Sequence, residues 1–67
     1  MLTTREIEVL EHLSEGKSNR KIALDMYISE YTLKSHIRNI YGKIDIPSWA
    51  HPRAWLAIHA AEVIENN

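Results

Sequence analysis

The sequence predicts an all-helical domain in which four helices share one core. Apolar residues recur at spacings of three and four, the period of an amphipathic helix. Residues that cap helix N-termini precede the first three apolar runs, and no stretch alternates with the period of two that marks a strand. The chain of 67 residues suffices for a single domain, spanning 1–67, and the predicted helices cover about residues 4–15, 19–26, 30–44 and 52–64.

The first helix has a clear start and a clear end. Thr3 and Glu6 have the spacing of a capping box, in which each side chain bonds the backbone amide of the other residue. Leu2 and Ile7 occupy the positions of a hydrophobic staple across this start. Gly16 can adopt the left-handed conformation that terminates a helix, so the helix is expected to end just before it.

Serines mark the starts of the next two helices. Ser18 is the expected N-cap of the second helix, and Ser29 is the expected N-cap of the third. A tight connection through Tyr27 and Ile28 separates them. The third helix has the most regular apolar face of the chain, formed by Leu33, Ile37, Ile40, Tyr41 and Ile44.

The fourth helix is expected to start at Pro52, because proline is well tolerated in a first helical turn. We expect one of the two tryptophans, Trp49 or Trp55, to belong to the core, and the sequence leaves open which one. The alternative is that a tryptophan joins an exposed apolar patch with Leu56, Ile58 or Val63. Tyr27 and Tyr41 are both expected to be buried or half-buried.

The charged residues are unevenly distributed, although the formal net charge is only −1. Residues 17–43 contain six basic and two acidic side chains, whereas the rest of the chain contains two basic and seven acidic ones. A basic centre between acidic ends predicts one localised positive surface, which is the kind of surface that meets phosphates.

Composition excludes several other kinds of site. The chain has no cysteine, so it forms no disulfide and no zinc–thiolate site, which suits a reducing cytoplasm. Its longest apolar run, residues 54–58, is too short to cross a membrane, and the N-terminus does not have the pattern of a signal peptide. We expect no cofactor, no metal and no small-molecule ligand; His59 and Glu62, one helical turn apart, are read as a surface pair.

The second and third predicted helices have the arrangement of a helix-turn-helix motif, spanning residues 18–37. On the third helix, Lys34, Ser35 and Arg38 lie away from the apolar face. Long donors beside a short polar residue suit a helix that enters the major groove of DNA, where guanine offers two acceptors. The N-terminus of the same helix offers free amides and a positive dipole end to phosphate, and Lys17, Arg20, Lys21 and Lys43 are expected around its rim.

Four segments together resemble LuxR/GerE-type helix-turn-helix domains: LTTREIEVL at 2–10, GKSNRKIA at 16–23, ISEYTLKSH at 28–36 and NIYGKI at 39–44. The resemblance covers about the first 46 residues, and in finer detail it is similar to the C-terminal domains of MalT-like regulators. It departs from the family pattern at Lys21, where an acid is usual, at Asp45, where glycine is usual, and in residues 47–53, which contain about two extra residues.

The resemblance implies a bacterial transcription regulator that binds double-stranded promoter DNA at a pseudo-palindromic site. Lys34, Ser35 and Arg38 match positions that face bases. Positions near the phosphate backbone are matched by Asn19, Lys21, Thr32 and Lys43. Tyr31 is placed with them, although packing over the turn is an equally good reading of this residue.

The resemblance also implies that the fourth helix forms a two-fold homodimer on DNA. The candidate dimerisation residues are Trp55, Ile58, His59 and Glu62. RNA polymerase is a possible further partner, and the expected location is the cytoplasm. A native Met1 would mean that the protein stands alone, whereas otherwise a sensory region precedes it.

One alternative from a different class is a helical interaction or dimerisation module that does not bind DNA and works through the fourth helix. The negative net charge and the unusual segment before that helix support this alternative. We expect no enzyme activity, because the sequence contains no arrangement of a nucleophile with a base, no phosphate-binding loop and no convergent pair of carboxylates.

Overall fold

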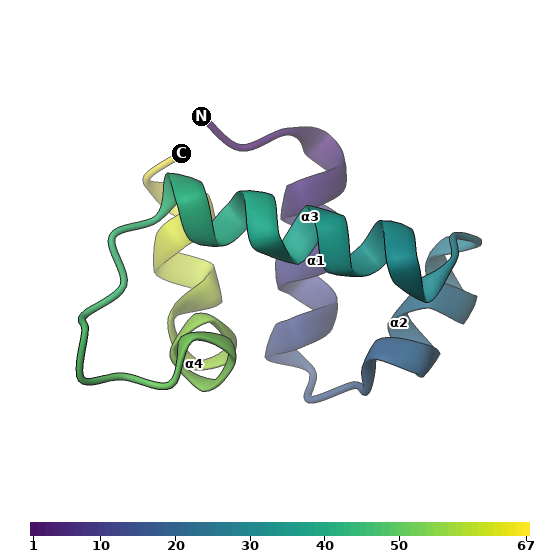
Figure 1. The fold of residues 1–67 in the computed structure, drawn as a ribbon. Coiled ribbons are helices and arrows are strands. Elements are labelled where there is room, and N and C mark those ends of the chain that lie inside the picture. The colour runs from purple at the N-terminus through teal and green to yellow at the C-terminus, as the bar shows by residue number, and fades with distance from the viewer.

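The computed structural model describes all 67 residues and contains four helices and no strand (Figure 1). The all-α prediction is therefore confirmed. The helices are α1 (Thr4–Ser14), α2 (Asn19–Met26), α3 (Glu30–Lys43) and α4 (Pro52–Glu65). The bounds of α2 are those predicted, and one end of each other helix differs from the prediction by one residue, because a terminal residue is only half in its helix.

The predicted caps account for where the first three helices begin. The Glu6 amide donates to Thr3 Oγ1 at 3.1 Å and the Thr3 amide donates to Glu6 Oε1 at 2.9 Å, which completes the capping box. Ser18 and Ser29 accept in the same way from the amides of Lys21 and Thr32. These bonds satisfy amides that the helices themselves leave without a partner.

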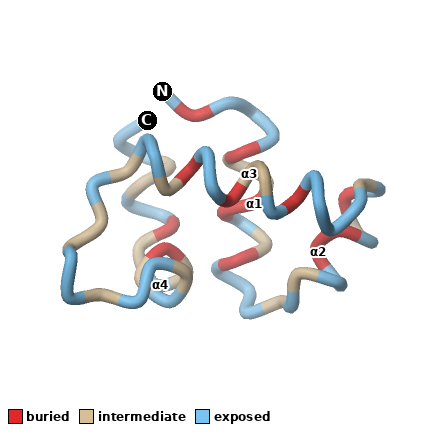
Figure 2. Tube along the Cα trace, viewed as in Figure 1, coloured by how far each residue is buried: buried red, intermediate tan, exposed pale blue.

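The core lies where α1 meets the other three helices, and the buried positions of each helix turn toward it (Figure 2). In Figure 1, α3 crosses in front of α1, while α4 and α2 lie to either side of it. Twelve buried apolar residues form this core: Leu2, Val9, Leu10, Leu13, Ile22, Ala23, Met26, Leu33, Ile37, Ile40, Leu56 and Ala60. Packing against α1 thus fixes the positions of α2 and α3 relative to each other.

The structure corrects one expectation about aromatic residues and resolves another. Tyr27 is 95% exposed rather than half-buried, because it takes the left-handed conformation that ends α2 (φ 57°) and Ile28 packs against the core in its place. Of the tryptophans, Trp55 is half-buried against the core, whereas Trp49 is 83% exposed in the loop between α3 and α4. Tyr41 is half-buried, as expected.

Candidate nucleic-acid interface

The two faces of α3 differ sharply. Leu33, Ile37 and Ile40 are buried and hold one face against the core. Lys34 and Arg38 are exposed on the other side, and Ser35 between them is half-buried. The Arg38 guanidinium reaches Ser35 Oγ at 3.4 Å, a long contact that costs little to replace. This edge of α3, formed by Lys34, Ser35 and Arg38, is called the α3 edge below.

The N-terminus of α3 presents polar groups next to this edge. Ser29 Oγ accepts from the Thr32 amide at 3.0 Å and lies 3.0 Å from the Thr32 hydroxyl. The first backbone bond of the helix runs from the Leu33 amide to the Ser29 carbonyl, so the amides of Glu30 and Tyr31 precede it. Tyr31 is 78% exposed here, which leaves its hydroxyl accessible. Accessible amides at a helix N-terminus favour an anion.

Half of the eight basic side chains are paired with carboxylates, and the pairing is selective. Arg5, Lys17, Lys21 and Lys43 contact acidic residues within 3.3 Å. The other four, Arg20, Lys34, Arg38 and Arg53, have no carboxylate partner. Three of these belong to α2 and α3, so the helix-turn-helix carries most of the positive charge that is free to meet an anion.

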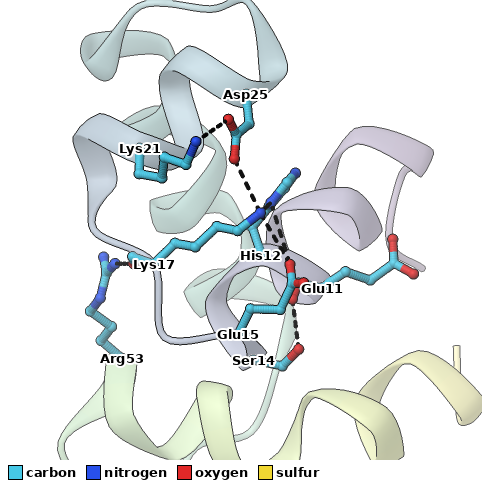
Figure 3. Close-up of polar contacts among 8 residues, drawn as sticks. All are labelled: Glu11, His12, Ser14, Glu15, Lys17, Lys21, Asp25 and Arg53. Carbon is cyan, nitrogen blue, oxygen red and sulfur yellow. Dashed lines mark hydrogen bonds and ion pairs between the residues drawn. The ribbon is translucent and has the colours of Figure 1, made fainter.

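Lys17 belongs to a polar cluster that joins α1 to α2 (Figure 3). Its Nζ lies 2.9 Å from His12 Nδ1, 3.1 Å from Asp25 and 3.3 Å from Glu15. The hydrogen bond to Asp25 raises the pKa of Lys17. Bonds from Lys21 and Lys17 lower the pKa of Asp25. Lys17 is thus neutralised within the domain. The Lys21 side chain is 60% exposed, and its ammonium pairs with Asp25 Oδ1 at a distance of 3.0 Å.

Asn19 and Arg53 connect the start of α2 to the start of α4. The Arg53 guanidinium donates to Asn19 Oδ1 and, at 3.0 Å, to the Lys17 carbonyl oxygen. The side-chain oxygen of Asn19 is therefore used inside the domain, and its amide nitrogen is the group left for a ligand. The sequence did not indicate this link, because the two residues are 34 positions apart.

Lys43 is also engaged inside the domain. Its ammonium contacts Glu6 Oε1 at 2.8 Å, and the Glu6 side chain is 3% exposed. Burial alone would raise the pKa of Glu6, but the hydrogen bonds from Lys43 and Thr3 outweigh it, and the pKa is lowered. Lys43 was expected near the DNA backbone. In the structure it neutralises a buried carboxylate, which is a structural role that a contact with DNA does not require.

The comparisons with known proteins agree with this geometry. Residues 1–52 match the profile of the bacterial regulatory proteins of the luxR family. This chain belongs to the LuxR family. The match includes α1, α2 and α3 with all three residues of the α3 edge, and identifies the chain as a helix-turn-helix DNA-binding domain of that family.

Individual relatives of this LuxR domain are bacterial regulators. The nitrate/nitrite response regulator protein NarP of Escherichia coli is 48% identical over 48 residues, which is 72% of this chain and 22% of NarP. The transcriptional regulatory protein DegU of Brevibacillus brevis is 48% identical over 46 residues, 69% of this chain and 20% of DegU.

A third relative, the CsgBAC operon transcriptional regulatory protein of Escherichia coli, is 40% identical over 55 residues, 82% of this chain and 26% of that protein. The LuxR domain thus spans about a fifth to a quarter of the length of these relatives. No solved structure gives a significant match to it.

The dimerisation residues predicted on α4 of the LuxR domain have the i, i+3, i+4, i+7 spacing of one helix face, but they differ in exposure. Ile58 is 78% exposed and the Glu62 side chain is 75% exposed. Trp55 is half-buried against the core and stacks on His59, with ring centroids 4.3 Å apart. His59 Nδ1 also lies 3.7 Å from Glu62. Only Ile58 and Glu62 therefore point fully outward.

Two small exposed residues lie beside Ile58 and were not among the predicted residues. Ala54 and Ala61 are exposed, and with Ile58 they have the i, i+4, i+7 spacing that places residues on one helix face. The spacing was visible in the sequence, but α4 is apolar on nearly all sides, so the pattern did not single out the outward face. These three residues, Ala54, Ile58 and Ala61, are called the α4 face below.

The LuxR domain contains neither a metal-binding cluster nor a membrane-spanning helix. No group of three or more histidine, cysteine or acidic side chains is arranged to hold a metal ion. None of the four helices combines the length and the apolar character that a membrane span requires.

Proposed function

We propose that this domain binds double-stranded DNA sequence-specifically, with α3 in the major groove and the α3 edge directed at the bases. The observation that carries the proposal is the exposure of Lys34 and Arg38 on α3 without any carboxylate partner. Four of the eight basic side chains pair with carboxylates, whereas Lys34 and Arg38 do not, so the exposed side of α3 keeps two unneutralised cations one helical turn apart. Arginine and lysine can donate to both major-groove acceptors of guanine, and Ser35 can bond any base edge nearby.

The phosphate backbone would be contacted from the groups around the α3 edge. The amides at the start of α3, together with Thr32 and Tyr31, suit one strand. Lys21 and the unpaired Arg20 suit the phosphates beside α2, and the amide nitrogen of Asn19 lies at the N-terminus of the same helix. Lys43 would contribute least, because reaching a phosphate would remove it from the buried carboxylate of Glu6.

Dimerisation through α4 is the second part of the proposal. The exposure of Ile58 between two alanines supports it, since small neighbours let two helices approach closely around one large side chain. Glu62 borders this face, and Trp55 and His59 support it from behind. A two-fold dimer would read a pseudo-palindromic promoter site with half-sites about 34 Å, one turn of DNA, apart.

In this proposal the domain is the output of a transcription regulator that works in the cytoplasm, where bacterial promoters lie. It carries out no chemistry itself, and RNA polymerase is the natural protein partner of a regulator bound at a promoter. The names of the relatives, which describe regulatory proteins, support the assignment to transcription.

The decisive experiment is selection of bound sequences from random duplex DNA with the 67-residue chain, followed by affinity measurements on the selected site. Arg38→Ala is expected to cost about 1–3 kcal/mol of binding free energy and to relax base preference at one position, because a base contact is lost. Lys21→Ala is expected to weaken all sequences evenly and to reduce the salt dependence.

A charge-matched control separates specific contacts from overall charge. Ser14→Asp also lowers the net charge by one, but Ser14 is exposed at the end of α1 and far from the α3 edge. It is expected to leave base preference unchanged. A chain that selects no DNA motif, or Arg38→Ala and Lys34→Ala variants that bind like the parent, would favour the interaction module without DNA binding.

A further inference from the structure

We infer that Trp49 of one copy of this domain docks in a groove at the opposite end of α4 in a second copy. The inference rests on the proposed function, because it specifies how two domains on one DNA site contact each other.

The first observation is the exposure of the indole. Trp49 is 83% exposed, although an isolated tryptophan at the surface gains nothing from its large apolar area. It is held in a short loop by a turn in which the Ala50 amide donates to the Pro47 carbonyl at 3.0 Å. The side chain is thus presented on an ordered segment immediately before α4.

The second observation is an open groove at the other end of α4. Its volume is about 590 Å³, and it is lined by both chain termini and by the ends of α3 and α4. Leu2, Ile44 and Val63 supply apolar walls, while Glu62 and Asn66 supply polar groups at its edge. An apolar groove with a polar rim suits an indole, which pairs a large apolar surface with one N–H donor.

The direction of α4 relative to the proposed DNA relates these two features. In Figure 1, α3 crosses in front of α1, so its unburied side faces the viewer, and α4 rises from a first turn that is seen almost end-on toward the C-terminus above it. Both copies must present α3 to the same duplex, so the two-fold axis runs toward the viewer. Rotation about this axis reverses the direction of α4 in the plane of the view, so in that plane the two α4 helices run antiparallel.

Antiparallel pairing brings Trp49 to the groove. If the α4 faces meet near Ile58, the loop before α4 in one copy comes to lie beside the C-terminal end of α4 in the other. Trp49 belongs to that loop, and Asn66 and Asn67 line the groove at that end. The loop and α4 also lie on the same side of the molecule, away from α2 (Figure 1).

The charges on α4 are complementary in the same orientation. Arg53 lies in the first turn of the helix, Glu62 and Glu65 lie near its end, and its last turn contains no basic residue. Acids near a helix C-terminus oppose the helix dipole. In an antiparallel pair, each acidic end lies beside the positive N-terminal end of the partner helix, which relieves this repulsion.

Cysteine cross-linking tests the arrangement directly, because the chain contains no cysteine of its own. Ser48→Cys and Asn66→Cys place one thiol beside Trp49 and one at the groove, both at exposed positions. With one chain lengthened by a tag, oxidation of the mixed variants is expected to give the mixed disulfide several-fold more efficiently than either self-disulfide. Predominant Ser48→Cys self-pairing, or no cross-linking above that of two Tyr27→Cys chains, would overturn the inference.

A second measurement uses Trp49 itself. Trp49→Ala is expected to leave affinity for a single half-site unchanged and to weaken cooperative binding to the full site by about tenfold or more, the factor that corresponds to about 1.4 kcal/mol. Tyr27→Ala, which removes an equally exposed aromatic ring at the far end of the molecule, is the matched control for self-association. Full-site cooperativity that survives Trp49→Ala would refute the contact.

The two outcomes separate this inference from the proposed function. If the parent chain binds no DNA, the proposed function fails, and the cross-linking pattern still decides whether Trp49 meets the groove. If half-site and full-site binding are normal but the mixed disulfide does not form, only the dimer contact fails. Helical circular dichroism of each variant confirms that an exposed substitution has left the fold intact.

Discussion

Lys43 and Glu6 show how a single pair can connect helices that are distant in sequence. The contact at 2.8 Å joins the end of α3 to the start of α1, and the carboxylate also completes the capping box with Thr3. Two functions thus converge on a side chain that is 3% exposed. A buried charge that loses its partner keeps its desolvation cost, so the pair matters more than a surface ion pair would.

Replacement of Lys43 is expected to affect folding before it affects any ligand. Lys43→Ala leaves the Glu6 carboxylate buried without its cation, and the free energy of unfolding should fall by about 1–3 kcal/mol. Urea denaturation measures this loss. Lys21→Ala is the matched control, because its Asp25 partner is accessible to water and the loss should be much smaller. Equal losses in both variants would contradict the role given to Lys43.

Long-range pairs of this kind are the part of the site that the sequence could not supply. The edge residues Lys34, Ser35 and Arg38 followed from helical spacing on one element, and they are on the exposed side of α3 as predicted. The partners of Lys43, Asn19 and Lys17 depend on how helices pack, which local spacing does not encode. Three of the predicted phosphate-side residues therefore proved to have partners that helical spacing does not give, in addition to the i, i+4 pair of Lys21 with Asp25.

Helix ends were predictable wherever side chains determine them. Thr3, Ser18 and Ser29 all cap as expected, and Gly16 takes a positive φ of 75° after α1. The end of α2 differs, because Tyr27 adopts the left-handed conformation that glycine usually provides. The Ile28 amide donates to the Ala23 carbonyl at 3.0 Å across this turn. Tyrosine gives no local signal for that geometry, so its exposure was not foreseen.

This turn offers a direct test of backbone strain. Tyr27→Gly is expected to raise the free energy of unfolding by about 0.5–1 kcal/mol. Glycine has no Cβ to oppose a left-handed conformation, and the figure allows for the entropy that glycine adds to the unfolded chain. Chemical denaturation at neutral pH measures the gain. Tyr27→Ala keeps the Cβ and should show no such gain. A destabilised glycine variant would mean that the tyrosine ring contributes contacts beyond those at its backbone.

The outward side of α4 was the least predictable surface on any element. Apolar residues occur around most of its circumference, so periodicity alone could not distinguish the core-facing side from the exposed one. Packing decides the matter: Leu56 and Ala60 are buried against the core, which turns Ile58 outward. The same packing makes Trp55, rather than Trp49, the tryptophan that contacts the core.

Acid pH is expected to destabilise the whole molecule through its paired carboxylates. The pKa values of Glu6 and Asp25 are lowered in the folded domain from ordinary values of 4.5 and 3.8. Their stabilising contribution is therefore complete above these values and is lost as the pH falls through the lower folded-state pKa values. The pKa of Lys17 is raised, so its contribution is lost only as the pH rises beyond 10.5.

The measurement is the free energy of unfolding between pH 2 and pH 7, compared for the parent and for Glu6→Gln. The parent should lose stability steadily below about pH 4.5, because the unfolded chain then binds more protons than the folded one. The Glu6→Gln variant should start less stable and show a shallower decline. Parallel curves for the two chains would mean that Glu6 does not contribute to the pH dependence.

The selective pairing of cations has a consequence for how the molecule meets a charged polymer. With a net charge of −1, it experiences almost no net pull toward DNA from a distance. The unpaired cations Arg20, Lys34 and Arg38 lie on α2 and α3, whereas the acids Glu62 and Glu65 lie on α4. The electric field of the DNA therefore exerts a torque on the molecule. The molecule is rotated before it is captured, and salt should alter the proportion of productive collisions more than their number.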